Sequence, residues 1–211
     1  MQFKIISKQT LLLIGALSGL TLITGLFLYF FPKNLIQGRA ALHVENIAPI
    51  PSPEQANAQS SLVLVGRPLR LKIPGINVDA PVEYVGLTSE GAMDVPKNPE
   101  NVAWYNLGPR PGENGSAVIA GHYDWKNKIP AVFNNLHTLR KGDKIYIEDE
   151  KDANTVFVVR EIQMYDKDDD AYDVFGLSDG KVRLNLITCT GVWNKIEKTY
   201  SDRLIVFADK E

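Results

Sequence analysis

A long charge-free apolar stretch near the N-terminus constrains this chain more than any other feature of its sequence. Residues 11–31 carry no charged side chain, and about 20 consecutive apolar residues are what an α-helix needs to cross a bilayer. We expect residues 11–31 to form a transmembrane signal anchor, with residues 1–10 in the cytoplasm and the remainder outside. Basic residues flank the stretch about equally on both sides and orient it only weakly. The predicted orientation therefore rests on the large domain that follows a single span.

The segment after the anchor is expected to be an extracytoplasmic linker. Residues 32–61 contain Pro49, Pro51 and Pro53 among polar side chains, a composition typical of extended chains without a packed core. A cleaved signal peptide is the alternative, because Ala56-Asn57-Ala58 has the small-x-small pattern of a cleavage site. The apolar stretch exceeds the ~7 to 15 residues of a signal-peptide core, which favours the anchor.

Residues 62–211 are expected to form the main domain, and their pattern predicts a mainly β fold. Short β-type runs are separated by Gly, Pro, Asn or Asp, and we expect strands at residues 70–73, 78–84, 117–122, 144–148, 155–164, 182–189 and 203–208. Two short helices are expected, at residues 130–139 and 171–176. Because so few helices cannot cover both faces of a parallel sheet, the pattern favours a mostly antiparallel barrel or sandwich.

Neither nucleic acid nor a metal is expected as a partner. The formal net charge is −2, with 23 basic and 25 acidic residues, whereas nucleic-acid-binding domains are usually basic. An acidic segment at residues 166–170 offers oxygen atoms to a hard cation, but it lacks the ligand spacing of an EF-hand. A solvated acidic loop is the favoured interpretation.

Cys189 is the only cysteine of the chain, so it cannot form an internal disulfide. In a domain outside the membrane a free thiol needs another explanation, and a catalytic nucleophile is the leading one. Side chains alternate along a strand, which places Cys189 off the more apolar face of residues 182–189. If the next strand pairs antiparallel with this one, Arg203 lies on the same rim. A guanidinium at that position favours thiolate over thiol.

A cysteine nucleophile usually also needs a proton carrier, and His122 is the better of two candidates in the main domain. His122 follows an apolar run, where a strand opens into a loop, and such positions often carry functional side chains. His137 lies near the end of the helix predicted at residues 130–139, beside Leu136 and Leu139, and is interpreted as a packed or surface structural residue. On these grounds alone a plain alternative stays open, with Cys189 a small buried hydrophobe, His122 a strand-end residue and Arg203 a surface charge.

Other segments accompany these three residues in a specific order. They are residues 68–78, 94–105 and 111–122, Leu186-Ile-Thr-Cys189 and Asp202-Arg203-Leu-Ile-Val206. Histidine, then Leu-x-Thr-Cys, then arginine, each at a strand edge, resembles the sortases, the membrane-anchored cysteine transpeptidases of bacterial cell surfaces. The signature of that family is Thr-Leu-x-Thr-Cys, and this chain departs from it with Asn185 in the first position. The Cys-Thr-Gly and Ile-Pro-Gly segments look most like class F, with classes D and E as near alternatives.

The resemblance implies an eight-stranded β-barrel that carries out a two-step acyl transfer. Cys189 would attack the threonine carbonyl of a Leu-Pro-x-Thr-Gly-like sorting signal, and an amine would resolve the thioacyl enzyme. His122 would move the protons, and Arg203 would orient the substrate and stabilise the oxyanion. Thr188 is expected to help bind the signal, and Trp193, in the loop between the two strands, to shape the groove. No cofactor is needed for this chemistry.

The expected partners are surface proteins that bear a sorting signal, together with an amine from a peptidoglycan precursor or a pilin lysine. The catalytic domain would face outward from the cell membrane of a bacterium. Two other functions stay open. One is a cysteine hydrolase that trims surface proteins, and the other is a catalytically silent barrel that only binds a peptide.

Overall fold

The computed structural model describes residues 65–176 and 179–211. The predicted cytoplasmic segment, anchor and linker, at residues 1–10, 11–31 and 32–61, therefore lie outside the described residues. Within the described ranges, no helix is long and apolar enough to cross a membrane.

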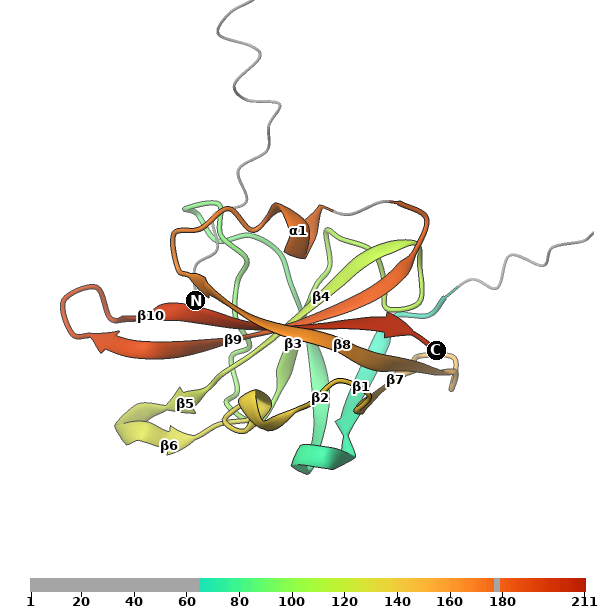
Figure 1. Ribbon diagram of the computed structural model, residues 1–211, viewed down its shortest axis with the longest axis horizontal. Helices are drawn as coiled ribbons and strands as arrows, with labels where there is room; N and C mark the ends of the chain where they lie inside the picture. Colours follow the sequence, from blue (N-terminus) through green and yellow to red (C-terminus); the bar gives the residue numbers. More distant parts are fainter. Residues whose placement is uncertain (1–64, 177–178) are drawn as a thin grey trace, which may run out of the picture. The chain divides into compact units, whose positions relative to one another are not determined.

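Eight strands of the described chain close into a β-barrel (Figure 1). Their order around the barrel is β1-β2-β3-β4-β9-β10-β8-β7, and β7 pairs with β1 to close it. Most neighbours are antiparallel, but β2 with β3 and β4 with β9 are parallel. The strands are β1 (Pro68–Ile73), β2 (Val78–Val85), β3 (Val102–Tyr105), β4 (Gly115–Gly121), β7 (Lys144–Asp149), β8 (Asn154–Asp166), β9 (Val182–Asn194) and β10 (Thr199–Lys210).

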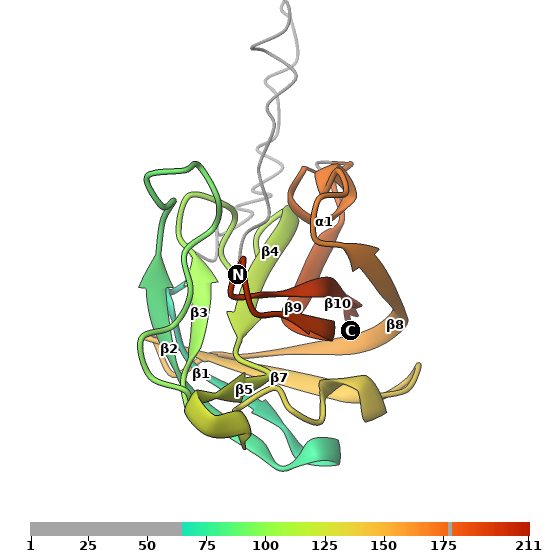
Figure 2. The same cartoon turned by 90° about the vertical axis from the view of Figure 1, so that its left-hand side faces the viewer.

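Short elements lie in the connections between the barrel strands. The strands β5 (Asp124–Trp125) and β6 (Ile129–Pro130) form a small hairpin, and the one α-helix of the described residues is α1 (Tyr172–Phe175). Three single 3-10 turns are η1 (Pro74–Ile76), η2 (Lys126–Lys128) and η3 (Leu136–Thr138). Two perpendicular views show the β5–β6 and β9–β10 hairpins on the same side of the barrel (Figure 1, Figure 2).

The paired strands β9 and β10 are buried on both faces where they cross the middle of the barrel. Leu184 and Leu186 belong to the cluster inside the barrel, whereas Ile187 belongs to a second cluster beneath α1. On β10, Val206 points to the first cluster and Phe207 to the second. Because side chains alternate with a period of two, burial on both faces favours a continuous apolar run, which β10 has at residues 204–208. In β9, the buried polar residues Arg183 and Asn185 alternate with the leucines.

Seven of the eight barrel strands overlap a predicted run, although β9 continues five residues beyond its run, to Asn194, and β10 begins four residues before its own, at Thr199. The strand that the sequence reading missed is β3, whose four residues are too few to show a period. The predicted helix at residues 130–139 is wrong. There Pro130 belongs to β6, and only the 3-10 turn η3 is helical.

Competing hydrogen bonds explain why residues 130–139 do not form an α-helix. The Val132 and Phe133 amides donate to the carbonyl oxygens of Pro99 and His122, 3.0 and 2.9 Å away. Along the rest of the segment, the amides of Asn134, Leu136 and Thr138 donate to carbonyl oxygens three residues back instead of four. Phe133 is fully buried in the barrel core. Tertiary contacts thus override the local preference for a helix.

The Phe133 ring lies so close to the end of β4 that only glycine fits at position 121. A Cβ atom on Gly121 would come within 2.4 Å of that ring. We therefore expect Gly121→Ala to lower the free energy of unfolding by about 1–3 kcal/mol, the usual range for overpacking a core. Urea unfolding of the full chain in detergent measures this change.

Gly75→Ala is the matched control, because a Cβ there meets its nearest atoms at 4.0 Å. Its effect is expected to stay within about 0.5 kcal/mol, as for surface substitutions in general. Equal unfolding midpoints for the two variants would contradict the close approach of Phe133 to Gly121.

Candidate active site

Cys189 lies on β9 directly opposite Arg203 on β10. The antiparallel register pairs these two residues across the strands, as strand alternation and an antiparallel neighbour predicted. Cys189 is partly exposed, whereas Arg203 is fully buried. A partly exposed thiol beside a cation is the setting in which a cysteine can act as a nucleophile.

His122 reaches the same rim through the parallel pairing of β4 with β9. The last paired residues are Ala120 and Ile187, and two further residues along each strand bring the chain to His122 and Cys189. The Thr188 hydroxyl donates to the Gly121 carbonyl oxygen at 2.8 Å, which continues the contact between the two strands beyond the last pair. His122 and Cys189 consequently line one cavity.

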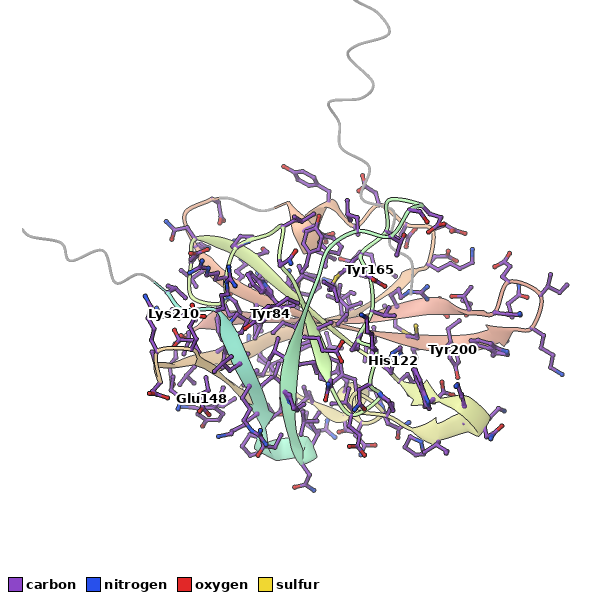
Figure 3. All side chains as sticks on the ribbon, turned by 180° about the vertical axis from the view of Figure 1, so that it is seen from behind. Tyr84, His122, Glu148, Tyr165, Tyr200 and Lys210 are labelled. Carbon is purple, nitrogen blue, oxygen red and sulfur yellow. The ribbon has the colours of Figure 1, made fainter. Side chains whose placement is uncertain are left out.

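This cavity, of about 480 Å³, lies between the β5–β6 and β9–β10 hairpins. Figure 3 shows His122 and Tyr200, which both line it, at the base of the two hairpins. Aromatic rings and lysines make up much of its wall. The lining residues are His122, Tyr123, Asp124, Trp125, Lys126, Asn127, Lys128, Cys189, Trp193, Lys198, Thr199 and Tyr200.

A hydrogen bond and an aromatic contact hold the His122 ring. Its Nε2 lies 2.8 Å from the Pro96 carbonyl oxygen, which can only accept, so Nε2 carries the proton and donates. The Trp125 ring lies edge-on to His122, with the ring centres 4.9 Å apart. In the neutral imidazole, Nδ1 is then the nitrogen with the free lone pair.

Burial lowers the pKa of His122 below its ordinary value. The bond to the Pro96 carbonyl oxygen and the negative charges of Glu83 and Asp124 oppose this shift without cancelling it. Desolvation penalises the imidazolium more than the neutral ring. The resting His122 side chain is therefore neutral near pH 7 and can accept a proton at Nδ1.

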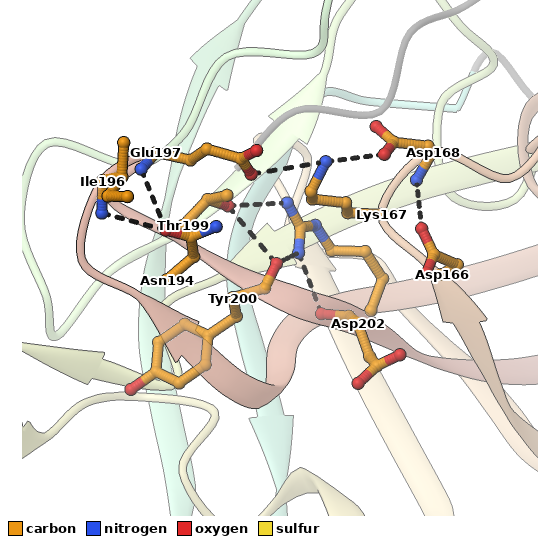
Figure 4. A network of polar contacts seen from close by, with 10 residues as sticks. Asp166, Lys167, Asp168, Asn194, Ile196, Glu197, Thr199, Tyr200 and Asp202 are labelled. Carbon is orange, nitrogen blue, oxygen red and sulfur yellow. Dashed lines mark hydrogen bonds and ion pairs between the residues drawn. The ribbon is translucent and has the colours of Figure 1, made fainter.

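The Arg203 guanidinium holds the base of the β9–β10 hairpin. Its Nη1 donates to the carbonyl oxygens of Tyr200 and Asp202, both at 2.9 Å, and its Nη2 donates to the Thr199 hydroxyl at 3.1 Å. Figure 4 shows the network around Thr199, Tyr200 and Asp202. Arg203 itself does not line the cavity. It positions Thr199 and Tyr200, which belong to the cavity wall.

Tyr200 joins the two hairpins. Its hydroxyl donates to Asp124 Oδ2 at 2.5 Å, and its ring lies edge-on to Tyr123 and Trp193, at centre distances of 5.8 and 5.1 Å. Burial, together with this hydrogen bond to the Asp124 carboxylate, raises the pKa of Tyr200. The hydroxyl therefore stays protonated and keeps the bridge closed.

A β-bulge turns β9 immediately after Cys189. Between the pairs Asp202–Thr190 and Tyr200–Trp193, two residues of β9 face one of β10, which is the pattern of a bulge. Gly191 has φ of 85°, a left-handed conformation that favours glycine. A Cβ at Gly191 would lie 2.0 Å from the Asp202 carboxylate.

The expected long loop between Cys189 and Arg203 is thus wrong in detail. Both strands continue past these residues, β9 to Asn194 and β10 from Thr199. Trp193 therefore lies on a strand instead of in a loop, and it lines the cavity. On either side of Trp193 in sequence, Val192 and Ile196 are exposed, at 76% and 92% of their full surface.

Thr188, like Arg203, is buried, and its hydroxyl donates to the Gly121 carbonyl oxygen. It does not line the cavity, so its predicted contact with a substrate stays a prediction. Asn185, at the departure from the family signature, is also buried and donates to the Val174 carbonyl oxygen at 2.7 Å. It fastens α1 to β9.

Nine of the twelve lining residues were not predicted from the sequence, among them Tyr123, Asp124, Trp125 and Tyr200. The first three follow His122 directly, and Tyr200 precedes Arg203 by three residues. The sequence signal that could have found them is the run of aromatic and acidic residues immediately after the proposed catalytic histidine.

The acidic segment at residues 166–170 directs several of its carboxylates to its own backbone. Asp166 Oδ1 accepts from the Asp168 amide at 3.0 Å, and Asp169 Oδ2 accepts from the Asp166 amide at 2.9 Å. Among the described residues, no group of three or more His, Cys, Asp or Glu side chains is placed to hold a metal ion.

A cysteine opposite a buried arginine, with a neutral histidine across the same cavity on the edge of a closed β-barrel, defines a cysteine-dependent acyl-transfer type of site. A family model of the sortase domain matches residues 71–211, and the chain belongs to the sortase family. Sortases are cysteine transpeptidases. A search of the curated proteins finds no match.

Solved sortase structures share the fold. Sortase C-1 of Actinomyces oris is 24% identical with a TM-score of 0.54, over 67% of this chain and 72% of that one. Sortase C1 of Streptococcus agalactiae, in complex with MTSET, is 25% identical with a TM-score of 0.50, over 67% and 66%. Sortase A of Corynebacterium diphtheriae is 22% identical with a TM-score of 0.53, over 70% and 62%. This chain spans less than two thirds of the last two. These relatives are named sortases C and A, and they leave the class F expectation a prediction.

The tautomer and pKa of His122 can be measured directly. The Cys189→Ala variant removes the thiolate, whose negative charge would otherwise stabilise the doubly protonated ring. In this variant we expect neutral His122 to carry its proton on Nε2. Burial should keep its pKa below about 6.5, the ordinary value for histidine. Long-range proton–nitrogen NMR spectra of the imidazole rings over a pH series give both quantities.

The chain has 3 histidines, so the His122 signals are assigned by their loss in a His122→Gln variant. A proton on Nδ1, or a pKa above the ordinary value, would contradict the described environment of the ring.

Proposed function

We propose that the protein is a membrane-anchored transpeptidase that cleaves a Leu-Pro-x-Thr-Gly-like sorting signal between threonine and glycine. It then transfers the threonine carbonyl to an amine. The observation that carries this proposal is the meeting of Cys189 and His122 in one cavity, with Arg203 opposite the cysteine. Family membership supports the general chemistry.

In the first step the Cys189 sulfur attacks the threonine carbonyl carbon. Neutral His122 takes the thiol proton at Nδ1, a carbon–sulfur bond forms, and the carbonyl oxygen becomes an oxyanion. When the carbon–nitrogen bond to glycine breaks, the imidazolium gives that proton to the departing amine. The products are a thioester on Cys189 and a free C-terminal fragment.

In the second step an incoming amine attacks the thioester. His122 accepts a proton from the attacking nitrogen, a new amide bond forms, and the sulfur leaves and regains its proton. Water in place of the amine gives hydrolysis as a side reaction. Because the pKa of His122 is lowered by burial, the ring returns its proton readily after each transfer.

Arg203 contributes through its charge and through its hydrogen bonds. Arg203 is the partner of Cys189 on the neighbouring strand. Its positive charge would stabilise negative charge on the sulfur and on the oxyanion. Its bonds to Tyr200 and Thr199 hold the wall against which the signal peptide would bind. Trp193 would shape the same wall.

The cellular setting forms part of the proposal. The apolar residues 11–31 support a single-pass anchor with the catalytic domain outside a bacterial cell. Surface proteins with a sorting signal are the proposed donors, and a peptidoglycan amine or a pilin lysine is the proposed acceptor. One matched structure is described as a pilus-related sortase C of group B Streptococcus. The Cys-Thr-Gly and Ile-Pro-Gly segments support class F.

The mechanism requires both the thiol and the imidazole. Full-length protein in detergent, given a sorting-signal peptide and a glycine amine, should form the transfer product. We expect Cys189→Ala to abolish cleavage and transfer, and His122→Gln to lower kcat/KM by about a hundredfold or more, the range for losing a general acid–base. Mass spectrometry of the products measures each reaction.

The products also separate the alternatives. Cleavage without amine incorporation would indicate a hydrolase, and peptide binding without turnover would indicate a silent barrel. Turnover by Cys189→Ala at the wild-type rate would exclude the mechanism altogether.

Charge and geometry at Arg203 can be tested apart. Arg203→Lys keeps the cation but cannot make the three hydrogen bonds to the hairpin at once, because Arg presents a planar fork and Lys a single point. We expect kcat/KM to fall about tenfold or more, which corresponds to a loss of about 1.4 kcal/mol of transition-state stabilisation.

Arg183→Lys is the matched control. Arg183 is also a buried arginine on the barrel wall, bonded to Asp179 at 2.6 and 2.8 Å, and it does not line the cavity. It should lower stability and leave the kcat/KM of the folded protein unchanged. An Arg203→Lys variant with wild-type activity would show that the charge alone suffices.

A further inference from the structure

We propose that the cavity beside Cys189 carries a cationic subsite, formed by Lys126, Lys128 and Lys198, that binds an anionic group of the substrate. The three lysines line the cavity from both hairpins. Lys126 and Lys128 lie at the tip between β5 and β6, and Lys198 immediately precedes β10. This inference rests on the proposed function, because it concerns which donor or acceptor that function uses.

The three positive charges are not neutralised by neighbouring carboxylates. Among the described residues, none of the three lysines forms an ion pair. The one acidic side chain of the cavity wall, Asp124, accepts the Tyr200 hydroxyl. Glu197, next to Lys198 in sequence, pairs with Lys167 at 3.5 Å instead. The cavity is thus locally positive in a chain with a formal net charge of −2.

Two of these lysines have a left-handed backbone conformation, which is unfavourable for lysine. Lys128 has φ of 59° and Lys198 has φ of 53°, in the left-handed region that glycine and asparagine adopt more easily. A lysine held there costs about 1 kcal/mol or more relative to glycine. Both positions lie in the tight turns of the two hairpins, which place these lysines in the cavity wall.

The aromatic walls suit a ligand that is anionic at one end and apolar along its length. Lys126 lies over the Trp125 ring, 5.8 Å from its centre, which orients the ammonium group without neutralising it. Trp193 and Tyr200 offer flat apolar surface on the opposite hairpin. A carboxylate or phosphate would meet the lysines while the rest of the ligand lies along these rings.

Two sources could supply this anionic group, and a pair of assays separates them. In the first, the full-length protein in detergent receives donor peptides that differ only by Glu, Gln or Lys at the variable position of the signal, with a neutral amide acceptor. In the second, the donor is the Gln peptide, and the acceptor is diglycine with a free carboxylate or its amide.

We expect one assay to show discrimination by charge. The acidic ligand should have a kcat/KM about three- to tenfold above its neutral analogue at low ionic strength, because exposed pairs contribute only about 0.2–1 kcal/mol each. The difference should shrink at about 1 M salt, where the Debye length falls to roughly 3 Å.

Substitutions assign the effect to the three lysines. The triple change of Lys126, Lys128 and Lys198 to Gln should remove the discrimination, and the same three positions changed to Arg should retain it. Lys141, Lys181 and Lys210, which are exposed and do not line the cavity, changed together to Gln, serve as the control and should behave as wild type.

Equal kcat/KM for acidic and neutral ligands in both assays would overturn the cationic subsite while leaving transpeptidation intact. Discrimination that persists in the Lys126, Lys128 and Lys198 Gln variant would overturn it as well. Absence of turnover with every donor and acceptor, by contrast, would overturn the proposed function itself.

Discussion

The antiparallel pairing of β9 with β10 is the interaction on which the rest of the site depends. Its register sets Cys189 opposite Arg203, and burial of both faces of these strands prevents them from slipping. A shift of one residue would exchange the two apolar faces and move Cys189 to the wrong side of the strand. The position of the sulfur is therefore fixed by the core of the barrel rather than by contacts at the site.

A second pairing, the parallel one between β4 and β9, supplies the proton carrier. Parallel strands run out of the sheet at the same end, so residues just beyond their last pair lie side by side. The Thr188 hydroxyl and the Gly121 carbonyl oxygen continue this contact to the last residue before His122. The nucleophile and the proposed base are thus brought together by two strand ends, without a long connecting loop.

The parts of the site that follow from strand periodicity were predictable, and those that depend on tertiary contacts were not. Alternation along residues 182–189, together with the assumption of an antiparallel neighbour, placed Cys189 on one rim with Arg203, and the pairing of β9 with β10 agrees. The helix predicted at residues 130–139 failed because the start of the segment bonds to other parts of the chain, and its later amides bond to carbonyl oxygens three residues back. Likewise, the hydrogen bond from Tyr200 to Asp124 joins residues far apart in sequence, and no local sequence pattern predicts it.

The same bond has a consequence for how such a site can change. The barrel fixes the reactive atoms, whereas two separate hairpins form the wall around them, and Tyr200 and Asp124 join those hairpins near their bases. Residues beyond that joint can vary in length or composition without disturbing Cys189 or His122. Exchanging the hairpin tips between homologous barrels, with the tyrosine and the aspartate retained, would therefore graft one enzyme's substrate preference onto another's catalytic centre.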